Sequence, residues 1–114
     1  MSAYAGIAVD LQQVYVSDEL SSLWALDRRT GVSLWKNSDL QRRFLTGPVV
    51  VGGYVAAGDF EGYLHLLSRI DGAVAGRQRV ERAGILAPPV AFGDRLLVLG
   101  AGGKLVMYQL SPVE

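Results

Sequence analysis

An internal repeat with a period of 41 residues constrains the fold of this chain more than any other feature of its sequence. Shifting the sequence by that period places residues 23–31 (LWALDRRTG) on residues 64–72 (LHLLSRIDG), and residues 61–67 (EGYLHLL) on residues 102–108 (GGKLVMY), without a gap. Such a period, with short apolar runs between glycine-rich turns, is typical of four-stranded β-propeller blades, which need neighbours to cover their faces. The sequence therefore predicts an all-β fold that is a fragment of a β-propeller.

Three blade repeats are predicted, at residues 6–46, 47–87 and 88–114. Short apolar runs bounded by turn residues predict four strands in the first repeat, four in the second and three in the third. The expected strands are residues 7–9, 14–17, 22–26 and 32–36, then 48–51, 54–58, 63–68 and 74–80, and finally 89–91, 95–99 and 104–110.

These strands make about two and three-quarter blades, and closed propellers need about four to eight. We therefore expect the chain to be a piece of a larger ring. The lack of a fourth strand in the third repeat favours the C-terminal end of a ring in which the N-terminal segment supplies the outermost strand. An arbitrary boundary is the alternative.

Turn residues support this division of the chain. Gly52-Gly53 and Gly93-Asp94 suit two-residue hairpins that require positive φ angles, whereas Leu11-Gln12 occupies the same place with less suitable residues. Gly31 and Gly72 are expected at the turns between third and fourth strands, where a left-handed residue costs least if it is glycine. Residues 38–45 are interpreted as a loop between blades.

The segment ALDRRTGVSLW, residues 25–35, matches the tryptophan-containing repeat of quinoprotein-like propellers. Asp27 is expected to accept hydrogen bonds from turn amides, Gly31 to form the turn, and Trp35 to lie across the gap to the next blade as a staple. The second repeat has Ser68 and Gly76 at the positions of Asp27 and Trp35, which predicts a weaker staple there.

Two further positions invite a chemical interpretation. His65 shares its repeat position with Trp24 and Val106, which predicts a packing position on a strand without a partner in its own motif. Asp59, Phe60 and Glu61 are interpreted as a surface turn and a possible partner-contact loop, because propellers bind through loops at a rim. The alternatives, a carboxylate pair or half of a cation site, lack further oxygen ligands at suitable spacing.

Composition narrows the classes of function. Eleven basic and eleven acidic residues balance, and cysteine is absent, so we expect neither a nucleic-acid partner nor disulfides or thiolate chemistry. The sequence shows no phosphate-binding glycine loop, nucleophile elbow, metal-ligand spacing or membrane-spanning segment. It predicts no catalytic, cofactor-binding or metal-binding residue. The remaining basic side chains are interpreted as solvated turns and strand edges: Arg28, Arg29, Arg42, Arg43, Arg77, Arg79 and Arg82.

Residues 35–67, WKNSDLQRRFLTGPVVVGGYVAAGDFEGYLHLL, resemble the C-terminal blades of the BamB family, the propeller lipoproteins of the bacterial outer-membrane β-barrel assembly machinery. This resemblance implies an eight-bladed parent ring on the periplasmic side of the outer membrane. It also implies a non-enzymatic scaffold that binds the barrel-inserting subunit and supports insertion of outer-membrane proteins. The family's signal peptide and lipidated cysteine are not in this sequence.

Two other classes of protein remain open at this point. A quinone-dependent dehydrogenase shares the repeat at residues 25–35, but its calcium, aspartate and basic cluster is not recognisable here. A generic interaction propeller of the WD type would show a tryptophan followed by aspartate, which this sequence lacks. Self-association of the fragment, through its terminal faces or the edge at residues 104–110, is a further expectation.

Overall fold

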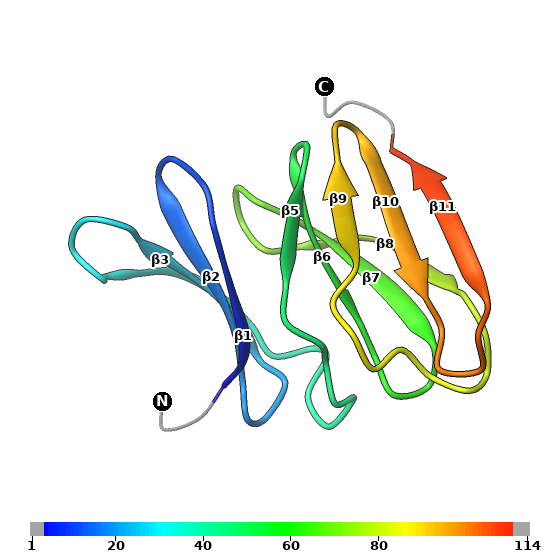
Figure 1. The fold of residues 1–114 in the computed structure, drawn as a ribbon. Helices are drawn as coiled ribbons and strands as arrows, with labels where there is room; N and C mark the ends of the chain where they lie inside the picture. The colour runs from blue at the N-terminus through cyan, green and yellow to red at the C-terminus, as the bar shows by residue number, and fades with distance from the viewer. Residues whose placement is uncertain (1–3, 111–114) are drawn as a thin grey trace.

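The computed structural model describes residues 4–110, and the side chains from residue 6 onward. This part of the chain forms eleven strands in three antiparallel sheets (Figure 1). The first sheet contains β1 (Tyr4–Val9), β2 (Gln13–Asp18), β3 (Leu23–Asp27) and β4 (Ser33–Asn37), in that order. The second contains β5 (Val49–Val51), β6 (Tyr54–Gly58), β7 (Tyr63–Ser68) and β8 (Val74–Arg79), and the third contains β9 (Val90–Phe92), β10 (Arg95–Leu99) and β11 (Leu105–Gln109).

The predicted all-β fold of propeller blades is confirmed, and the strand ends differ from the prediction in instructive ways. Strands β5 and β9 begin at Val49 and Val90, one residue after the prolines that were expected to open them. Proline has no amide hydrogen to donate to a sheet, so the pairing starts only at the next residue. Strand β1 begins at Tyr4, earlier than expected, because a register shift between Tyr4 and Gly6 lets its pairing with β2 continue.

The three sheets are arranged as neighbouring blades around the side where their first strands meet. Strand β5 lies between β1 and β9, and the later strands of each sheet extend outward from there (Figure 1). Because each blade is a simple meander, its turns alternate between two rims. The upper rim carries the β1–β2, β3–β4, β5–β6, β7–β8 and β9–β10 turns, and the lower rim carries the remaining connections.

Two apolar cores lie between the blades, one at each junction. Side chains alternate between the faces of a strand, so strands β6 and β7 of the second blade contribute to both junctions. The core between the first and second blades contains Tyr15, Leu23, Ala25, Trp35, Leu40, Leu45, Val55, Ala57 and Leu67. The core between the second and third blades contains Val51, Ala56, Leu64, Val80, Ile85, Leu96 and Val98.

The connection from β4 to β5 is a loop, as predicted, and it contains both buried and exposed residues. Leu40 is buried in the first core, whereas Phe44, four residues later, is exposed. Arg42 and Phe44 have φ angles of 67° and 52°, which are left-handed values for non-glycine residues. The loop therefore cannot continue as a helical turn, and it directs Phe44 away from the core.

Candidate functional site

The turn between β3 and β4 is built as the sequence motif suggests. One Asp27 carboxylate oxygen accepts hydrogen bonds from the amides of Arg29 at 2.8 Å and Thr30 at 3.0 Å. The hydrogen bond from the Thr30 amide, which has the larger effect, and the one from the Arg29 amide lower the pKa of Asp27 below its ordinary 3.8. Gly31 follows with a φ of 75°.

Trp35 contacts the second blade through both its ring and its indole nitrogen. Its Nε1 donates a hydrogen bond to the Arg69 carbonyl at 3.0 Å, and its ring lies against the backbone of Gly72. Gly72 also has a φ of 75°, and its carbonyl accepts a hydrogen bond from the Asn37 side chain at 2.7 Å. These contacts join β4 of one blade to the β7–β8 turn of the next.

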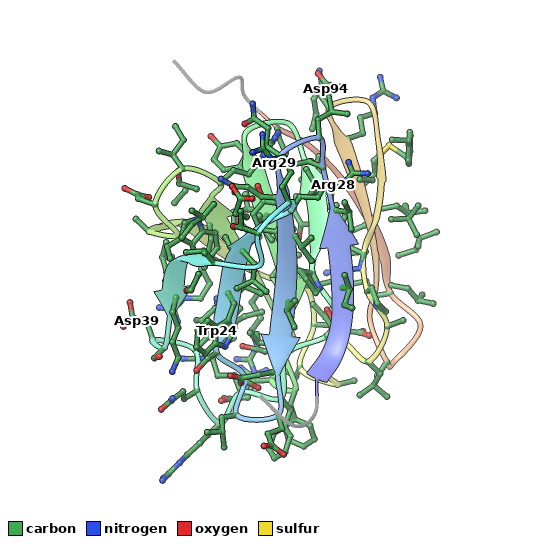
Figure 2. All side chains as sticks on the ribbon, turned by 90° about the vertical axis from the view of Figure 1, so that its left-hand side faces the viewer. Trp24, Arg28, Arg29, Asp39 and Asp94 are labelled. Carbon is green, nitrogen blue, oxygen red and sulfur yellow. The ribbon has the colours of Figure 1, made fainter. Side chains whose placement is uncertain are left out.

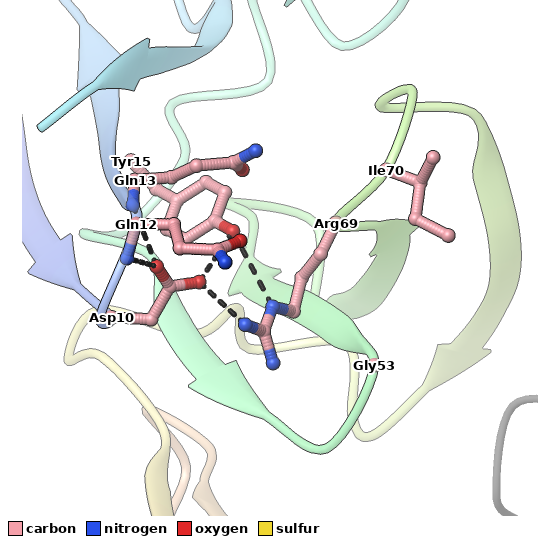
Figure 3. Close-up of a pocket in the computed structure, with 7 residues that line it drawn as sticks. All are labelled: Asp10, Gln12, Gln13, Tyr15, Gly53, Arg69 and Ile70. Atoms are coloured by element: carbon pink, nitrogen blue, oxygen red, sulfur yellow. Dashed lines mark hydrogen bonds and ion pairs between the residues drawn. The ribbon is translucent and has the colours of Figure 1, made fainter.

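A second set of contacts between these two blades lies on the upper rim, and it was not predicted from the sequence (Figure 3). One oxygen of Asp10 caps the β1–β2 turn by accepting the amide hydrogens of Gln12 and Gln13. The other oxygen accepts hydrogen bonds from the Tyr15 hydroxyl at 2.8 Å and from Arg69 at 2.6 Å. A groove of about 360 Å³ lies beside this network, between Gln12 and Ile70.

The electrostatics of this junction follow from its burial and its hydrogen bonds. Burial and the hydrogen bond to Asp10 raise the pKa of Tyr15 to about 12, so this hydroxyl stays a donor at neutral pH. Burial alone would raise the pKa of Asp10, but the hydrogen bonds from the turn amides and Tyr15, together with Arg69, outweigh it and lower that pKa. Asp10 also explains how Leu11-Gln12 forms a tight turn without glycine, because its carboxylate accepts hydrogen bonds from the amides of the turn.

On the lower rim, the burial and the pairing of Asp59 and His65 differ from what the sequence predicts. Asp59 is not a surface carboxylate: its exposed fraction is 0%. His65, also 0% exposed, does have a partner, because its Nε2 lies 2.7 Å from an Asp59 oxygen. Arg43 is not a solvated turn residue either, since it donates to the same oxygen at 3.0 Å. The other Asp59 oxygen accepts the amides of Glu61 and Tyr63, each at 2.9 Å.

The repeat contains a signal for this network. Asp18 occupies the position of Asp59 one repeat earlier, and it accepts a hydrogen bond from the Trp24 Nε1 at 2.8 Å, just as Asp59 pairs with His65. In both blades a carboxylate at the end of the second strand binds a ring nitrogen six residues later. The histidine therefore replaces a tryptophan in a structural role, which agrees with the predicted packing position but not with the absence of a partner.

Exposed aromatic and basic side chains gather on the lower rim beside this buried network. Phe60 and Phe44 are 61% and 73% exposed, and their ring centroids lie 5.8 Å apart. Close by, three guanidinium groups surround the Tyr63 ring at 4.9–5.9 Å from its centroid. We call this surface the aromatic–arginine corner; its residues are Arg43, Phe44, Phe60, Tyr63, Arg77 and Arg79.

The exposed side chains of the lower rim offer apolar and charged contacts to a partner. Between residues 4 and 110, no group of three or more His, Cys, Asp or Glu side chains is placed to hold a metal ion. None of these residues belongs to a helix long and apolar enough to cross a membrane. Of the predicted contact loop, Phe60 and Glu61 are exposed at the lower rim, whereas Asp59 is buried beneath them.

The fold and the two loop-bearing rims define a set of β-propeller blades. Residues 19–112 match the sequence model of the family described as "Outer membrane protein assembly factor BamB". The chain belongs to this BamB family.

Named relatives support this assignment. The chain is 44% identical over 109 residues to an outer membrane protein assembly factor BamB of Pseudomonas aeruginosa, an alignment covering 96% of this chain and 29% of the relative. It is 39% identical over 97 residues to the BamB of Escherichia coli, covering 85% of this chain and 25% of the relative. The chain thus spans between a quarter and a third of the length of these relatives.

Solved structures agree on the fold. The crystal structure of BamB from Moraxella catarrhalis has a TM-score of 0.83 and 30% identity, over 91% of this chain and 30% of that one. A quinohemoprotein alcohol dehydrogenase from Pseudomonas putida has a TM-score of 0.78 at 20% identity, over 93% of this chain and 19% of that one. At that identity, the likeness to the dehydrogenase concerns the fold alone.

Proposed function

We propose that this chain is a non-enzymatic binding module of the machinery that assembles outer-membrane β-barrel proteins. In this role it acts on the periplasmic side of the outer membrane and contacts the barrel-inserting subunit, so that insertion is supported by scaffolding rather than by catalysis. The observation that carries the proposal is the family match over residues 19–112, together with relatives named as assembly factors. The dehydrogenase alternative is supported only by a shared fold at about one-fifth sequence identity.

Backbone hydrogen bonds that order the loops of the lower rim support a role in binding. Hydrogen bonds between backbones connect its loops across each junction, from Phe60 N to Arg43 O at 2.9 Å and from Ala101 N to Gly84 O at 2.7 Å. These two bonds occupy equivalent positions in successive repeats, and a bond from Ile85 N to Asp59 O at 2.8 Å adds to them. Loops that are already ordered lose less conformational entropy on binding, which favours affinity.

Binding to the purified periplasmic region of the barrel-inserting subunit tests this function. With the chain immobilised, we expect saturable binding by interferometry, and we expect Phe60→Ser to weaken it because this exposed ring lies on the proposed contact loop. Leu11→Ser, which removes an exposed apolar side chain from the upper rim, serves as the matched control. Absence of binding, under conditions where a full-length BamB binds the same preparation, would contradict the proposal.

Self-association is a second proposed interaction of the isolated chain. Within residues 4–110, β11 pairs with β10 only, and apolar side chains on the outer face of the third blade are exposed: Val90, Phe92, Leu99, Leu105 and Met107. An unpaired edge beside an apolar face favours addition of another strand or sheet. We expect light scattering after size exclusion to show a mass that rises with concentration, and Met107→Lys to reduce that rise. A constant monomer mass across the series would disprove self-association.

A further inference from the structure

The aromatic–arginine corner has features that the propeller fold itself does not require. Phe44 comes from the β4–β5 loop of one blade and Phe60 from the β6–β7 loop of the next, and the hydrogen bond from Phe60 N to Arg43 O fixes the two loops together. Large aromatic side chains are normally buried, so a pair of neighbouring exposed rings is informative. Such pairs frequently serve as anchors in protein interfaces.

The backbone beneath Phe44 is held in an uncommon conformation. Arg42 and Phe44 both have positive φ angles, which are sterically disfavoured for residues with a side chain. The hydrogen bond from Arg42 N to Leu20 O before Phe44, and the burial of Leu45 directly after it, keep the loop in this shape. Conformations of this kind persist where the surroundings enforce them, and they cluster at functional sites.

Charge at the corner is predominantly positive and only partly compensated. The guanidinium groups of Arg79, Arg77 and Arg43 lie 4.9, 5.4 and 5.9 Å from the centroid of the Tyr63 ring. Asp59 is already shared between Arg43 and His65, and Arg79 donates to the Glu61 carbonyl rather than to its carboxylate. Among the described residues, neither Arg77 nor Arg79 forms an ion pair.

Of the two junctions that the structure describes, only the one between the first and second blades carries this combination. At the next junction, Ile85 occupies the position of Phe44 and is buried, and Ala101 occupies the position of Phe60. Lys104 stands where the second blade has Tyr63. The next junction keeps the backbone bond between its loops without any of these aromatic rings, so the fold does not explain their presence.

We propose that the aromatic–arginine corner binds an acidic peptide segment that carries an aromatic or aliphatic anchor. The anchor packs on Phe44 and Phe60, and the carboxylates of the segment face Arg77 and Arg79, which provide charge-assisted hydrogen bonds. This inference rests on the proposed function, because it names the chemistry of the partner that the lower rim takes.

A fluorescein-labelled synthetic peptide, with one phenylalanine between aspartate and glutamate residues, is a suitable probe for fluorescence anisotropy. We expect saturable binding that weakens as salt increases, because part of the attraction is between exposed charges. A peptide with lysine in place of each acidic residue should bind at least about tenfold more weakly, and so should a peptide with alanine in place of phenylalanine.

Variants of the protein separate the two components of the site. We expect Phe44→Ser with Phe60→Ser, and separately Arg77→Glu with Arg79→Glu, each to weaken binding at least about tenfold. The control is Arg29→Glu with Arg95→Glu, which changes the net charge by the same amount on the upper rim. Both of these side chains are exposed, and Arg29 is labelled in Figure 2. This control variant should bind the peptide with unchanged affinity. Circular dichroism and thermal unfolding check that each variant keeps its fold.

Each of the following results would overturn the inference: equal binding of the acidic and lysine peptides, an equal loss with the upper-rim control, or unchanged affinity in both corner variants. Binding of phosphatidylglycerol vesicles that depends on Arg77 and Arg79, without peptide binding, would instead assign the arginines to a membrane surface and also reject it. If the barrel-inserting subunit binds normally while the peptide does not, only this inference fails and the proposed function stands.

Discussion

Replacing Asp59 by alanine is expected to destabilise the protein by about 3–5 kcal/mol, the usual cost of removing one partner from a buried ion pair. Both Asp59 and His65 are fully buried, and the change leaves His65, Arg43 and two backbone amides without their acceptor. Urea-induced unfolding followed by circular dichroism measures the effect.

Asp18→Ala is the matched control, because Asp18 occupies the same repeat position. Asp18 is only half-buried and, among the described residues, no arginine pairs with it as Arg43 pairs with Asp59, so we expect a loss of about 1–2 kcal/mol. Equal losses in the two variants would show that burial and charge at Asp59 do not matter.

The difference between the wild type and Asp59→Ala should also depend on pH. Burial would raise the pKa of Asp59, but the hydrogen bonds from His65 and the Tyr63 amide, together with Arg43, outweigh it and lower that pKa below 3.8. A carboxylate with a lowered folded-state pKa contributes stability that is complete above the unfolded value and is lost as pH falls through the folded value. The difference in stability between the two proteins should therefore shrink at pH values below 3.8, and a constant difference would contradict this assignment.

Gly72→Val is the second substitution with a large expected effect, about 2–5 kcal/mol. A β-branched residue at a φ of 75° is strained, and a Cβ at this position would collide with the Trp35 ring. Gly31 has the same φ of 75°, but a Cβ added there would meet no other atom within 4 Å, so Gly31→Val carries the backbone cost alone, about 1–2 kcal/mol.

Chemical denaturation of both glycine variants isolates the contribution of Trp35 to the junction. The excess cost of Gly72→Val over Gly31→Val measures the collision between blades, and it should shrink when Trp35→Ala is introduced beside Gly72→Val. If both valine variants lose the same stability, then Trp35 does not pack against this turn in solution.

The elements of this fold were predictable from sequence, because blades are local structures. The alternation of apolar residues and the turn glycines lie within one repeat, so they determine strands such as β6 and β7 almost to the residue. The side-chain networks were not predictable in the same way. Arg69 and Asp10 are separated by 59 residues, and only the packing of one blade on another brings them together.

The candidate site was predictable in part, for a related reason. Phe60 and Glu61 are exposed on the lower rim as expected, since a short turn between strands displays its central residues. Asp59 was misinterpreted because its neighbours in sequence suggest a solvated turn, whereas its partners come from a strand and from another loop. A comparison of repeat positions would have related Asp59 and His65 to Asp18 and Trp24.

Arg69 binds the first blade through both its side chain and its main chain. Its guanidinium binds Asp10, and its carbonyl accepts the hydrogen bond from Trp35, while Arg43 and Asp59 join the same two blades at the opposite rim. Because contacts hold this junction at both rims, the two blades cannot hinge about one rim without breaking the contacts at the other. We therefore expect the first two blades to open as a single cooperative unit, because local opening requires the loss of both sets of contacts together.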